Sequence, residues 1–398
     1  MPSDFRSPSR PNKKSANRKT PTSEQELAAA FDVAPTKRLK KPGILQKFTS
    51  WWSGLNRNLR FGIIALALLL FGAVALGIYY FNQPQSEPSI EFTKSTPPKP
   101  TTVASPLTGV QVDPELAKRP VTGIMIENSI DARPQSGIHE AGVVFEAIAE
   151  GGITRFLTLF QETQPQYVGP VRSLRPYYID FASAFQAPIA HIGGSPDALS
   201  QIRNGGRDLD QFFNSGSYWR VSSRRSPHNV YTSFEKLDAL NQKKGYTSSQ
   251  FTPWPRKAEA KLATPTARVI DVNISSALYN SHYDYDGVSN SYGRSEGGQA
   301  HISTSGEADK SGQQIKPKVV VVLVVPYSLS GKYSVYNISA GGTAYVFQDG
   351  GVTVGTWSKA DRNSQFVFKD ANGQPIGLNP GQAWVTLVAN PEKVTYAP

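Results

Sequence analysis

The chain has 398 residues, which is room for two or three domains of ordinary size. Its net charge of +11 is uneven, because residues 1–60 hold 13 Lys and Arg against 4 Asp and Glu, while residues 82–398 hold 29 against 27. The basic tail excludes a uniformly cationic nucleic-acid-binding globule, and the absence of Cys excludes disulfides, thiolate metal sites, a thiol nucleophile and lipid attachment at a cysteine.

Polar segments lie on both sides of a long apolar segment near the N-terminus. Residues 1–60 are rich in Ser, Pro, Lys and Arg, and we expect them to be a disordered basic cytoplasmic tail. Residues 82–105 contain five prolines, a composition typical of an extended linker. The globular part of the chain is expected to begin near residue 106.

Residues 61–81, FGIIALALLLFGAVALGIYYF, contain no Lys, Arg, Asp, Glu or His. A helix of this length, at 1.5 Å per residue, crosses the roughly 30 Å hydrocarbon core of a bilayer. Trp51 and Trp52 precede the segment, Tyr79 and Tyr80 end it, and the basic residues concentrate on its N-terminal side. We expect a single-pass signal anchor with the N-terminus in the cytoplasm and residues 82–398 outside the cell membrane; a cleaved signal peptide is the alternative.

Short apolar runs alternate with helical patterns over residues 106–240, which is typical of a mixed α/β domain. Strands are expected at 121–126 and 188–192. Two further strands, at 142–149 and 153–160, should form a hairpin about Gly151-Gly152. Helices are expected at 176–185 and from Pro196 onward, where Ser195 can act as N-cap.

The second half of the ectodomain has a strand-rich pattern. Residues 241–265 are expected to connect the two domains, and residues 266–398 to form a smaller β-rich C-terminal domain. The fold class is therefore predicted to be α+β, plus one transmembrane helix. The expected strands are 269–274, 319–325, 333–336, 343–347, 365–368 and 383–388, and the run VVVVLVV at 319–325 indicates a central strand buried on both faces.

Arginine is strongly preferred over lysine in residues 106–240, with ten Arg and two Lys, whereas residues beyond 240 hold four Arg and eleven Lys. A planar guanidinium can bind a carboxylate or phosphate through two hydrogen bonds, so the bias favours an anion-binding site. The alternative is internal pairing of these arginines with carboxylates. Candidates for that pairing are Glu127, Asp131, Glu146, Glu150 and Asp180.

Three short segments concentrate the residues expected to bind an anion. Arg172 and Arg175 precede a predicted helix, where backbone N–H groups favour negative charge. A strand, a glycine turn and a helix start follow one another from His191, and a third segment places Arg and His on one loop. The candidate ligand-binding residues are Arg133, Arg155, Arg172, Arg175, Gly193, Gly194, Ser195, Arg224, Arg225 and Asn229.

Catalysis is a second possibility that the sequence leaves open. His191 or His228 could act as a general base, with Glu127, Glu146 or Glu150 as the acid or orienting carboxylate. A serine hydrolase is disfavoured because Gly-Gly-Ser-Pro lacks the Gly-x-Ser-x-Gly pattern. The five His are scattered and the carboxylates at 284 and 286 are expected in a turn, so we expect no metal and no cofactor.

Several of these motifs together resemble the YerB-like family of bacterial envelope proteins, a domain of unknown function. The resemblance implies an N-terminal and a C-terminal domain, often carried by a lipoprotein; this chain lacks the cysteine for lipidation and has its apolar segment instead. It implies no reaction and no catalytic residues. The matching stretches are 123–137 (GIMIENSIDARPQSG), 141–160, 169–178 (GPVRSLRPYY), 191–196, 226–233 (SPHNVYTS), 285–301, 355–359 (GTWSK) and 379–385 (NPGQAWV).

These observations favour an envelope protein that binds an anionic ligand, such as a cell-wall polymer or glycan, through its arginine-rich domain. An envelope hydrolase or transferase with a His/Glu pair is one alternative. A scaffold for protein partners is the other. We expect the ectodomain not to bind nucleic acid.

Overall fold

The computed structural model describes residues 43–83, 101–307 and 312–398, and the chain divides into two compact units, Met1–Thr93 and Lys94–Pro398. The predictions for the tail before residue 43 and for most of the linker lie outside the described residues.

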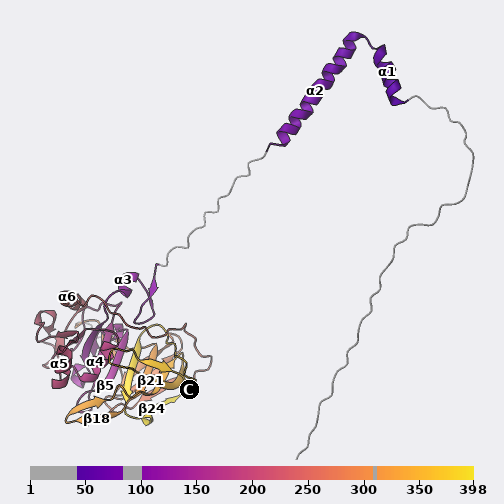
Figure 1. The fold of residues 1–398 in the computed structure, drawn as a ribbon. Coiled ribbons are helices and arrows are strands. Elements are labelled where there is room, and N and C mark those ends of the chain that lie inside the picture. The colour runs from indigo at the N-terminus through magenta and orange to yellow at the C-terminus, as the bar shows by residue number, and fades with distance from the viewer. Residues whose placement is uncertain (1–42, 84–100, 308–311) are drawn as a thin grey trace, which may run out of the picture. The chain divides into compact units, whose positions relative to one another are not determined.

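Two helices form the described part of the first unit, α1 (Ile44–Gly54) and α2 (Arg57–Phe81) (Figure 1). Asn56 caps α2, because its side chain accepts a hydrogen bond from the N–H of Leu59 at 2.9 Å. Within the part of the chain that the structure describes, α2 is the one helix long and apolar enough to cross a membrane. This matches the apolar segment that the sequence predicts.

The structure differs from the expected disordered tail at residues 44–54, which form α1. Ile44, Leu45, Phe48, Trp51 and Trp52 recur at the spacing of one helix face, so the segment has a continuous apolar stripe. The rings of the three aromatic residues lie beside one another, with centroids 5.8 to 6.3 Å apart. This periodicity was concealed by the overall basic composition of the tail.

A ten-stranded mixed sheet organises the second unit, and its strands come from both residues 106–240 and residues 266–398. In spatial order the strands are β22 (Val367–Lys369), β21 (Gly351–Ser358), β20 (Gly342–Gln348), β17 (Val319–Val324), β23 (Ala383–Val388), β5 (Val143–Ile148), β6 (Thr154–Phe160), β3 (Thr122–Glu127), β7 (Ile189–His191) and β8 (Asp208–Asp210).

Strand β17 lies inside this sheet, antiparallel to β20 and parallel to β23. Its successive side chains enter two different cores, Val321 and Leu323 on one face and Val320 and Val322 on the other. The prediction of a central strand buried on both faces is confirmed. The hairpin of β5 and β6 is also confirmed, with Gly151 and Gly152 at φ angles of 59° and 78°.

Helices and a second sheet cover the two faces. The helices α4 (Pro176–Ser183) and α5 (Pro196–Arg203) contribute to the first core, and α6 (Phe234–Lys244) to the second. In Figure 1, α5 and α6 lie at the side of the unit away from β21 and β24. The second core is completed by a five-stranded antiparallel sheet of β14 (Gln299–Ala300), β13 (Ser291–Glu296), β12 (Ser281–Asp286), β11 (Val269–Val272) and β24 (Val394–Ala397).

The remaining elements are short. They are α3 (Pro114–Ala117), the 3₁₀ turns η1 (Ile130–Ala132), η2 (Ile138–Glu140), η3 (Ser215–Ser217) and η4 (Pro391–Lys393), a three-stranded sheet of β16 (Gln313–Gln314), β15 (Ile302–Thr304) and β4 (Gln135–Ser136), and the two-stranded sheets β1 (Val103–Ala104) with β2 (Gln111–Val112), β9 (Trp219–Arg220) with β10 (Val230–Tyr231), and β18 (Tyr327–Ser330) with β19 (Tyr333–Tyr336).

The second unit is mixed α and β with a β-rich C-terminal part, but residues 106–240 and 266–398 do not separate in space. β23 pairs in parallel with β5, so strands of both segments form one sheet and one compact unit. The connection at 241–265 packs against both, since the ring centroid of Trp254 lies 5.5 Å from that of Phe185 in the first segment and the contacts that follow reach the second. Trp254 Nε1 donates to Phe366 O at 3.0 Å, and Arg256 Nη1 donates to Asn379 O at 3.1 Å.

The carboxylates expected in a turn at 284–287 belong instead to β12. The strand has alternating burial, with Tyr283 and Tyr285 inward and Asp284 outward. The turn begins directly after β12, at Gly287, and there the Oδ1 of Asp286 accepts from the N–H of Val288 at 2.9 Å. The alternation of aromatic and acidic residues was the available signal for a half-buried strand.

Candidate functional site

Glu127, the last residue of β3, has a carboxylate shared between Arg172 and His228. Its Oε1 lies 3.1 Å from Arg172 Nε and its Oε2 lies 2.9 Å from His228 Nδ1. Ser129 Oγ is 3.2 Å from the same imidazole nitrogen. The Glu127 side chain is 5% exposed, whereas those of Arg172 and His228 are 24% and 20% exposed, so the carboxylate is covered by two partners that solvent can reach.

Glu150 forms the neighbouring pair of contacts. Its Oε2 lies 3.2 Å from Arg155 Nη2, and its Oε1 contacts Arg175 Nη2. Arg155 Nη1 also donates to Ser173 O at 2.9 Å. The guanidinium of Arg175 lies over the ring of Tyr333, 5.5 Å from its centroid, which is a cation–π geometry.

The sheet and one loop bring these residues together. Arg155 on β6 lies opposite Glu127 in the antiparallel register with β3. The N–H of Arg172 donates to Met125 O at 2.8 Å, which holds the 169–175 loop along the end of β3. We call Glu127, Glu150, Arg155, Arg172, Arg175 and His228 the arginine cluster.

Positive charge exceeds negative charge in the arginine cluster, because three guanidinium groups face two carboxylates. Burial lowers the pKa of Arg155, Arg172 and Arg175, since desolvation penalises the charged form. Glu127 opposes this at Arg172, while the charge of Arg155 adds to the lowering of the Arg172 pKa. The carboxylates therefore do not fully replace the hydration that the guanidinium groups lose.

His191 lies in a different, fully buried place. Its Nε2 is 3.0 Å from Asp208 Oδ1 and its Nδ1 is 2.8 Å from Gly193 O. The N–H of Gly193 donates to Asp210 Oδ1 at 3.0 Å, and the N–H of Ser195 donates to Leu174 O at 3.2 Å. His191 and two backbone donors of this turn are thus engaged with the protein itself.

Ser195 caps α5 as the sequence predicts, since its Oγ accepts from the N–H of Ala198 at 3.3 Å. Gly194 is bridged to Leu174. Anion binding by Gly193, Gly194 and Ser195 stays a prediction.

Among the described residues, Arg224 and Arg225 form no ion pair with the arginine cluster, although the N–H of His228 donates to Arg225 O at 2.9 Å. Arg224 donates to the carbonyls of Asp131 and Pro134 at 2.8 and 2.7 Å. Asn229 accepts from Arg220 at 2.7 Å and is 9% exposed, while Arg225 is exposed. Arg133 belongs to another group of side chains, around Glu296.

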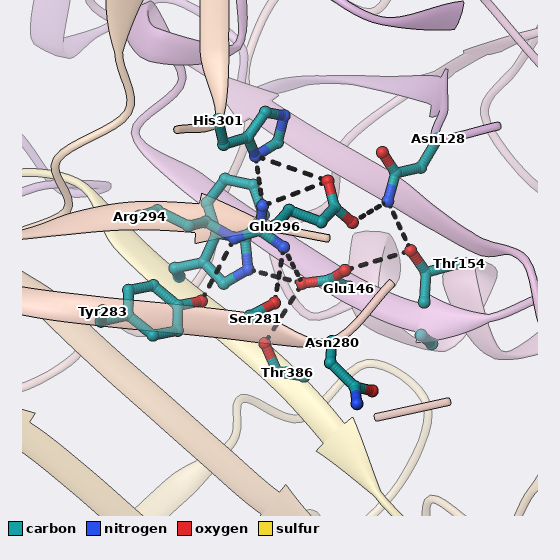
Figure 2. A network of polar contacts seen from close by, with 12 residues as sticks. Asn128, Glu146, Thr154, Asn280, Ser281, Tyr283, Arg294, Glu296, His301 and Thr386 are labelled. Atoms are coloured by element: carbon teal, nitrogen blue, oxygen red, sulfur yellow. Dashed lines mark hydrogen bonds and ion pairs between the residues drawn. The ribbon is translucent and has the colours of Figure 1, made fainter. Parts of the chain in front are cut away.

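A buried polar network connects residues 106–240 with residues 266–398 (Figure 2). At its centre the fully buried Arg294 on β13 donates through Nη2 to Glu146 Oε2 on β5 at 2.9 Å and to Ser281 Oγ at 2.7 Å. Glu146 also accepts from Trp384 Nε1 at 3.0 Å and from Thr154 Oγ1 at 3.1 Å. Glu146, a candidate catalytic carboxylate by sequence, is thereby fixed inside the core.

The other side of this network contains Glu296 and His301. Glu296 Oε2 lies 3.4 Å from Arg294 Nη1, and its Oε1 accepts from Asn128 Nδ2 and lies 3.2 Å from Arg133 Nη2. His301 Nδ1 accepts from Arg294 Nη1, so the imidazole proton is on Nε2, which donates to Gln135 Oε1 at 3.0 Å. The network thus assigns a neutral His301.

Burial shifts the charges of this network strongly. It raises the pKa of Glu296 to about 7, against the opposing effect of Arg294, and Glu146 raises it further. Burial also lowers the pKa of His301 well below its ordinary value, and Arg294 adds to that. Burial opposes the charge of Arg294, but Glu146 and Glu296 outweigh it and raise its pKa.

Sequence reasoning missed Arg294, Glu296 and His301 as a group. Two signals were present: Arg294 and Glu296 are two residues apart in a strand and therefore share one face, and all three lie in the family-like stretch 285–301. The structure brings together Glu127, Glu150, Arg155, Arg172, Arg175 and His228, but places Arg133, Glu146 and His191 elsewhere.

Comparison with known proteins assigns the family. The chain is 31% identical over 296 residues to the protein named "Putative lipoprotein YerB" of Bacillus subtilis (strain 168), covering 71% of this chain and 86% of that protein. The crystal structure of the YerB protein from Bacillus subtilis superimposes with a TM-score of 0.66 at 28% identity, covering 74% of this chain and all of that chain. Residues 107–247 match the N-terminal domain, and residues 270–385 the C-terminal domain, of the family described as protein of unknown function DUF3048. This chain therefore belongs to the DUF3048 family, as its YerB-like motifs predict.

Proposed function

We propose that this chain is a membrane-anchored extracytoplasmic protein that binds an anionic ligand of the cell envelope at the arginine cluster. The observation that carries the proposal is the excess of three guanidinium groups over two carboxylates in one partly exposed group. A bound anion would supply the negative charge that the two carboxylates do not provide for the three partly buried guanidinium groups. The candidate ligands are cell-wall polymers and glycans that carry phosphate or carboxylate groups.

Arg172 is the residue of this cluster best placed to meet a ligand. Its side chain is 24% exposed, and only Glu127 among the described residues forms an ion pair with it. The imidazole of His228 lies on the other oxygen of Glu127 and is also open to solvent. A phosphate or carboxylate at this place would bind the free edge of a guanidinium without breaking the Glu150 contacts.

Two observations support the location. α2 has the length and composition of a membrane span, and the similar protein of Bacillus subtilis carries the name "Putative lipoprotein YerB", which is consistent with membrane association. The basic residues before α2 favour an N-terminus in the cytoplasm, which would place residues 82–398 in the envelope.

The test uses residues 94–398, a compact unit with its own core, and poly(glycerol phosphate) as the anionic probe. Saturable binding is expected at about 50 mM NaCl and a marked loss at about 300 mM, because such contacts are screened by salt. Arg172→Gln should weaken binding roughly threefold or more. Arg119→Gln is the matched control, since Arg119 forms a comparable pair with Asp238 at 2.7 Å outside the cluster. Absence of binding at low salt, or equal binding by both variants, would refute the proposal.

A hydrolase or transferase is the second candidate, and one distance favours it. His228 Nδ1 lies 2.9 Å from Glu127 Oε2, which meets the requirement for a base oriented by a carboxylate. Its other nitrogen, Nε2, is 3.9 Å from the exposed Asp131 and can reach a bound molecule. Release of soluble fragments from purified cell wall, abolished by His228→Asn and retained by Arg119→Gln, would establish this function; no release by the wild-type protein would exclude it for that substrate.

A further inference from the structure

A cleft of about 540 Å³ opens beside the buried network, at a place distinct from the arginine cluster. Its walls include Ile130, Leu278 and Ile302, which come from η1, the loop before β12 and β15. Ile130 is 52% and Leu278 49% exposed, so the walls present apolar surface to solvent. A concave apolar surface of this size with a few polar groups is typical of a small-molecule site. We call it the Arg133 cleft.

Arg133 is fixed at this cleft before any ligand binds. Its Nε donates to Asn128 Oδ1 at 3.2 Å, and its Nη2 donates to Leu278 O at 3.1 Å. The guanidinium also lies over the ring of Tyr279, 5.3 Å from its centroid. A side chain held from several sides loses little conformational freedom when it binds a further group.

One nitrogen of this guanidinium remains available. Nη1 of Arg133 has no hydrogen-bond partner among the residues that the structure describes, although Nε and Nη2 are both engaged. Nη1 lies 3.5 Å from the position that a Cβ would take on Gly297, a residue of the cleft wall. The free N–H groups are therefore at the cleft and can donate to an acceptor there.

The charges around the cleft favour an anion. Arg294 and Glu146 form a fully buried pair whose charges offset each other. His301 is neutral, and Glu296 in the cleft wall is only 3% exposed, so burial favours its neutral form. With Glu296 protonated, the charge of Arg133 is left uncompensated, and its side chain is 21% exposed.

We propose that the Arg133 cleft is a second ligand-binding site that takes a small amphipathic carboxylate. The carboxylate accepts hydrogen bonds from Arg133 Nη1, and the apolar body lies along Ile130, Leu278 and Ile302. This site goes beyond the proposed polymer binding, since it uses different residues and a different kind of ligand.

Proton uptake on binding follows from the position of Glu296. The ionisable groups that face it are Arg294 on its own strand, Glu146 on β5, Arg133 after η1 and His301 before β15. A bound carboxylate adds negative charge beside Glu296 and so favours its protonated form. Affinity for the carboxylate should therefore be highest below pH 7 and should fall between pH 6 and pH 8.

Octanoate is a suitable probe, with octanol and octylamine testing the need for the negative charge. Titration of residues 94–398 with octanoate, below the concentration at which it forms micelles, should show saturable binding. Arg133→Gln should weaken it about tenfold, the loss expected for a charge-assisted hydrogen bond. Arg172→Gln, in the arginine cluster, should leave octanoate binding unchanged, and this separates the site from the polymer site. Octanol and octylamine should bind both the wild-type protein and Arg133→Gln weakly and equally.

The pH dependence supplies an independent readout. Wild-type affinity should be at least roughly threefold weaker at pH 8 than at pH 6, and Glu296→Gln should remove this difference. If that variant does not fold, proton uptake by the wild-type protein can be measured from the binding heat in two buffers of different ionisation enthalpy. Absence of saturable octanoate binding, equal binding by Arg133→Gln, or tighter binding at pH 8 than at pH 6 would each overturn the proposal.

Discussion

Replacing Glu296 by Gln should change how the stability of residues 94–398 depends on pH. The pKa of Glu296 in the folded protein is about 7, against an ordinary value of 4.5. Because the folded-state pKa is the higher one, the stabilising contribution is fully present below the unfolded pKa and is lost as pH rises through about 7. At about 1.36 kcal/mol per pH unit, the free energy of unfolding should fall by about 3 kcal/mol between pH 4.5 and pH 8.

Gln has nearly the same shape as Glu and cannot ionise, so the variant should not show this loss. Chemical denaturation of residues 94–398 at pH 5, 6, 7 and 8 should give similar stabilities for wild type and Glu296→Gln at pH 5, and a more stable variant at pH 8. Glu115→Gln is the control, since Glu115 has a 78% exposed side chain far from the core. Parallel pH profiles for wild type and Glu296→Gln would refute the assigned burial and charge of this carboxyl.

Three further changes test other parts of the structure. Arg294→Met leaves Glu146 and Glu296 buried without their cation, so chemical denaturation at pH 7 should show that the free energy of unfolding falls by about 3 to 5 kcal/mol. The fall should be smaller at pH 5, where a carboxyl can take up a proton. An equal fall at both pH values would contradict this. Ser195→Ala removes the cap of α5 and should lower the free energy of unfolding by about 1 kcal/mol in the same measurement. An unchanged free energy of unfolding would show that the cap contributes nothing. In Gly151→Ala, the added Cβ has no neighbouring atom within 4 Å, but the residue has a φ of +59°. The free energy of unfolding should therefore fall by about 1 to 2 kcal/mol through backbone strain alone.

Features that depend on neighbouring residues could be predicted from the sequence. Ser195-Pro196 predicts a capped helix start because both preferences act within one turn, and α5 begins there. Gly151-Gly152 predicts a hairpin because both positions need positive φ, and both have it. The apolar segment before residue 82 has the length of a membrane span and forms α2.

Features that depend on distant pairing could not be predicted in the same way. Arg294 and Glu146 are 148 positions apart, and nothing in the local pattern of either indicates the other. The arginine bias was a valid signal of carboxylate contacts, but it could not say which arginines share a site. Arg155, Arg172 and Arg175 converge, whereas Arg133 lies with Glu296 because the chain after β3 turns toward β13.

The two family regions form one compact unit, and the buried network joins them. β5 would present an open edge in the middle of the sheet without β23, and Glu146 on that strand would lose both Arg294 and Trp384. An unpaired charge in such a place costs several kcal/mol, a large part of the stability of a typical domain. The same contacts position Asn128, which holds Arg133 at the cleft, and Asn128 directly follows Glu127 of the arginine cluster. The Arg133 cleft therefore depends on contacts that form only when the first region packs against the second, and the arginine cluster also has such a contact, between Arg175 and the ring of Tyr333.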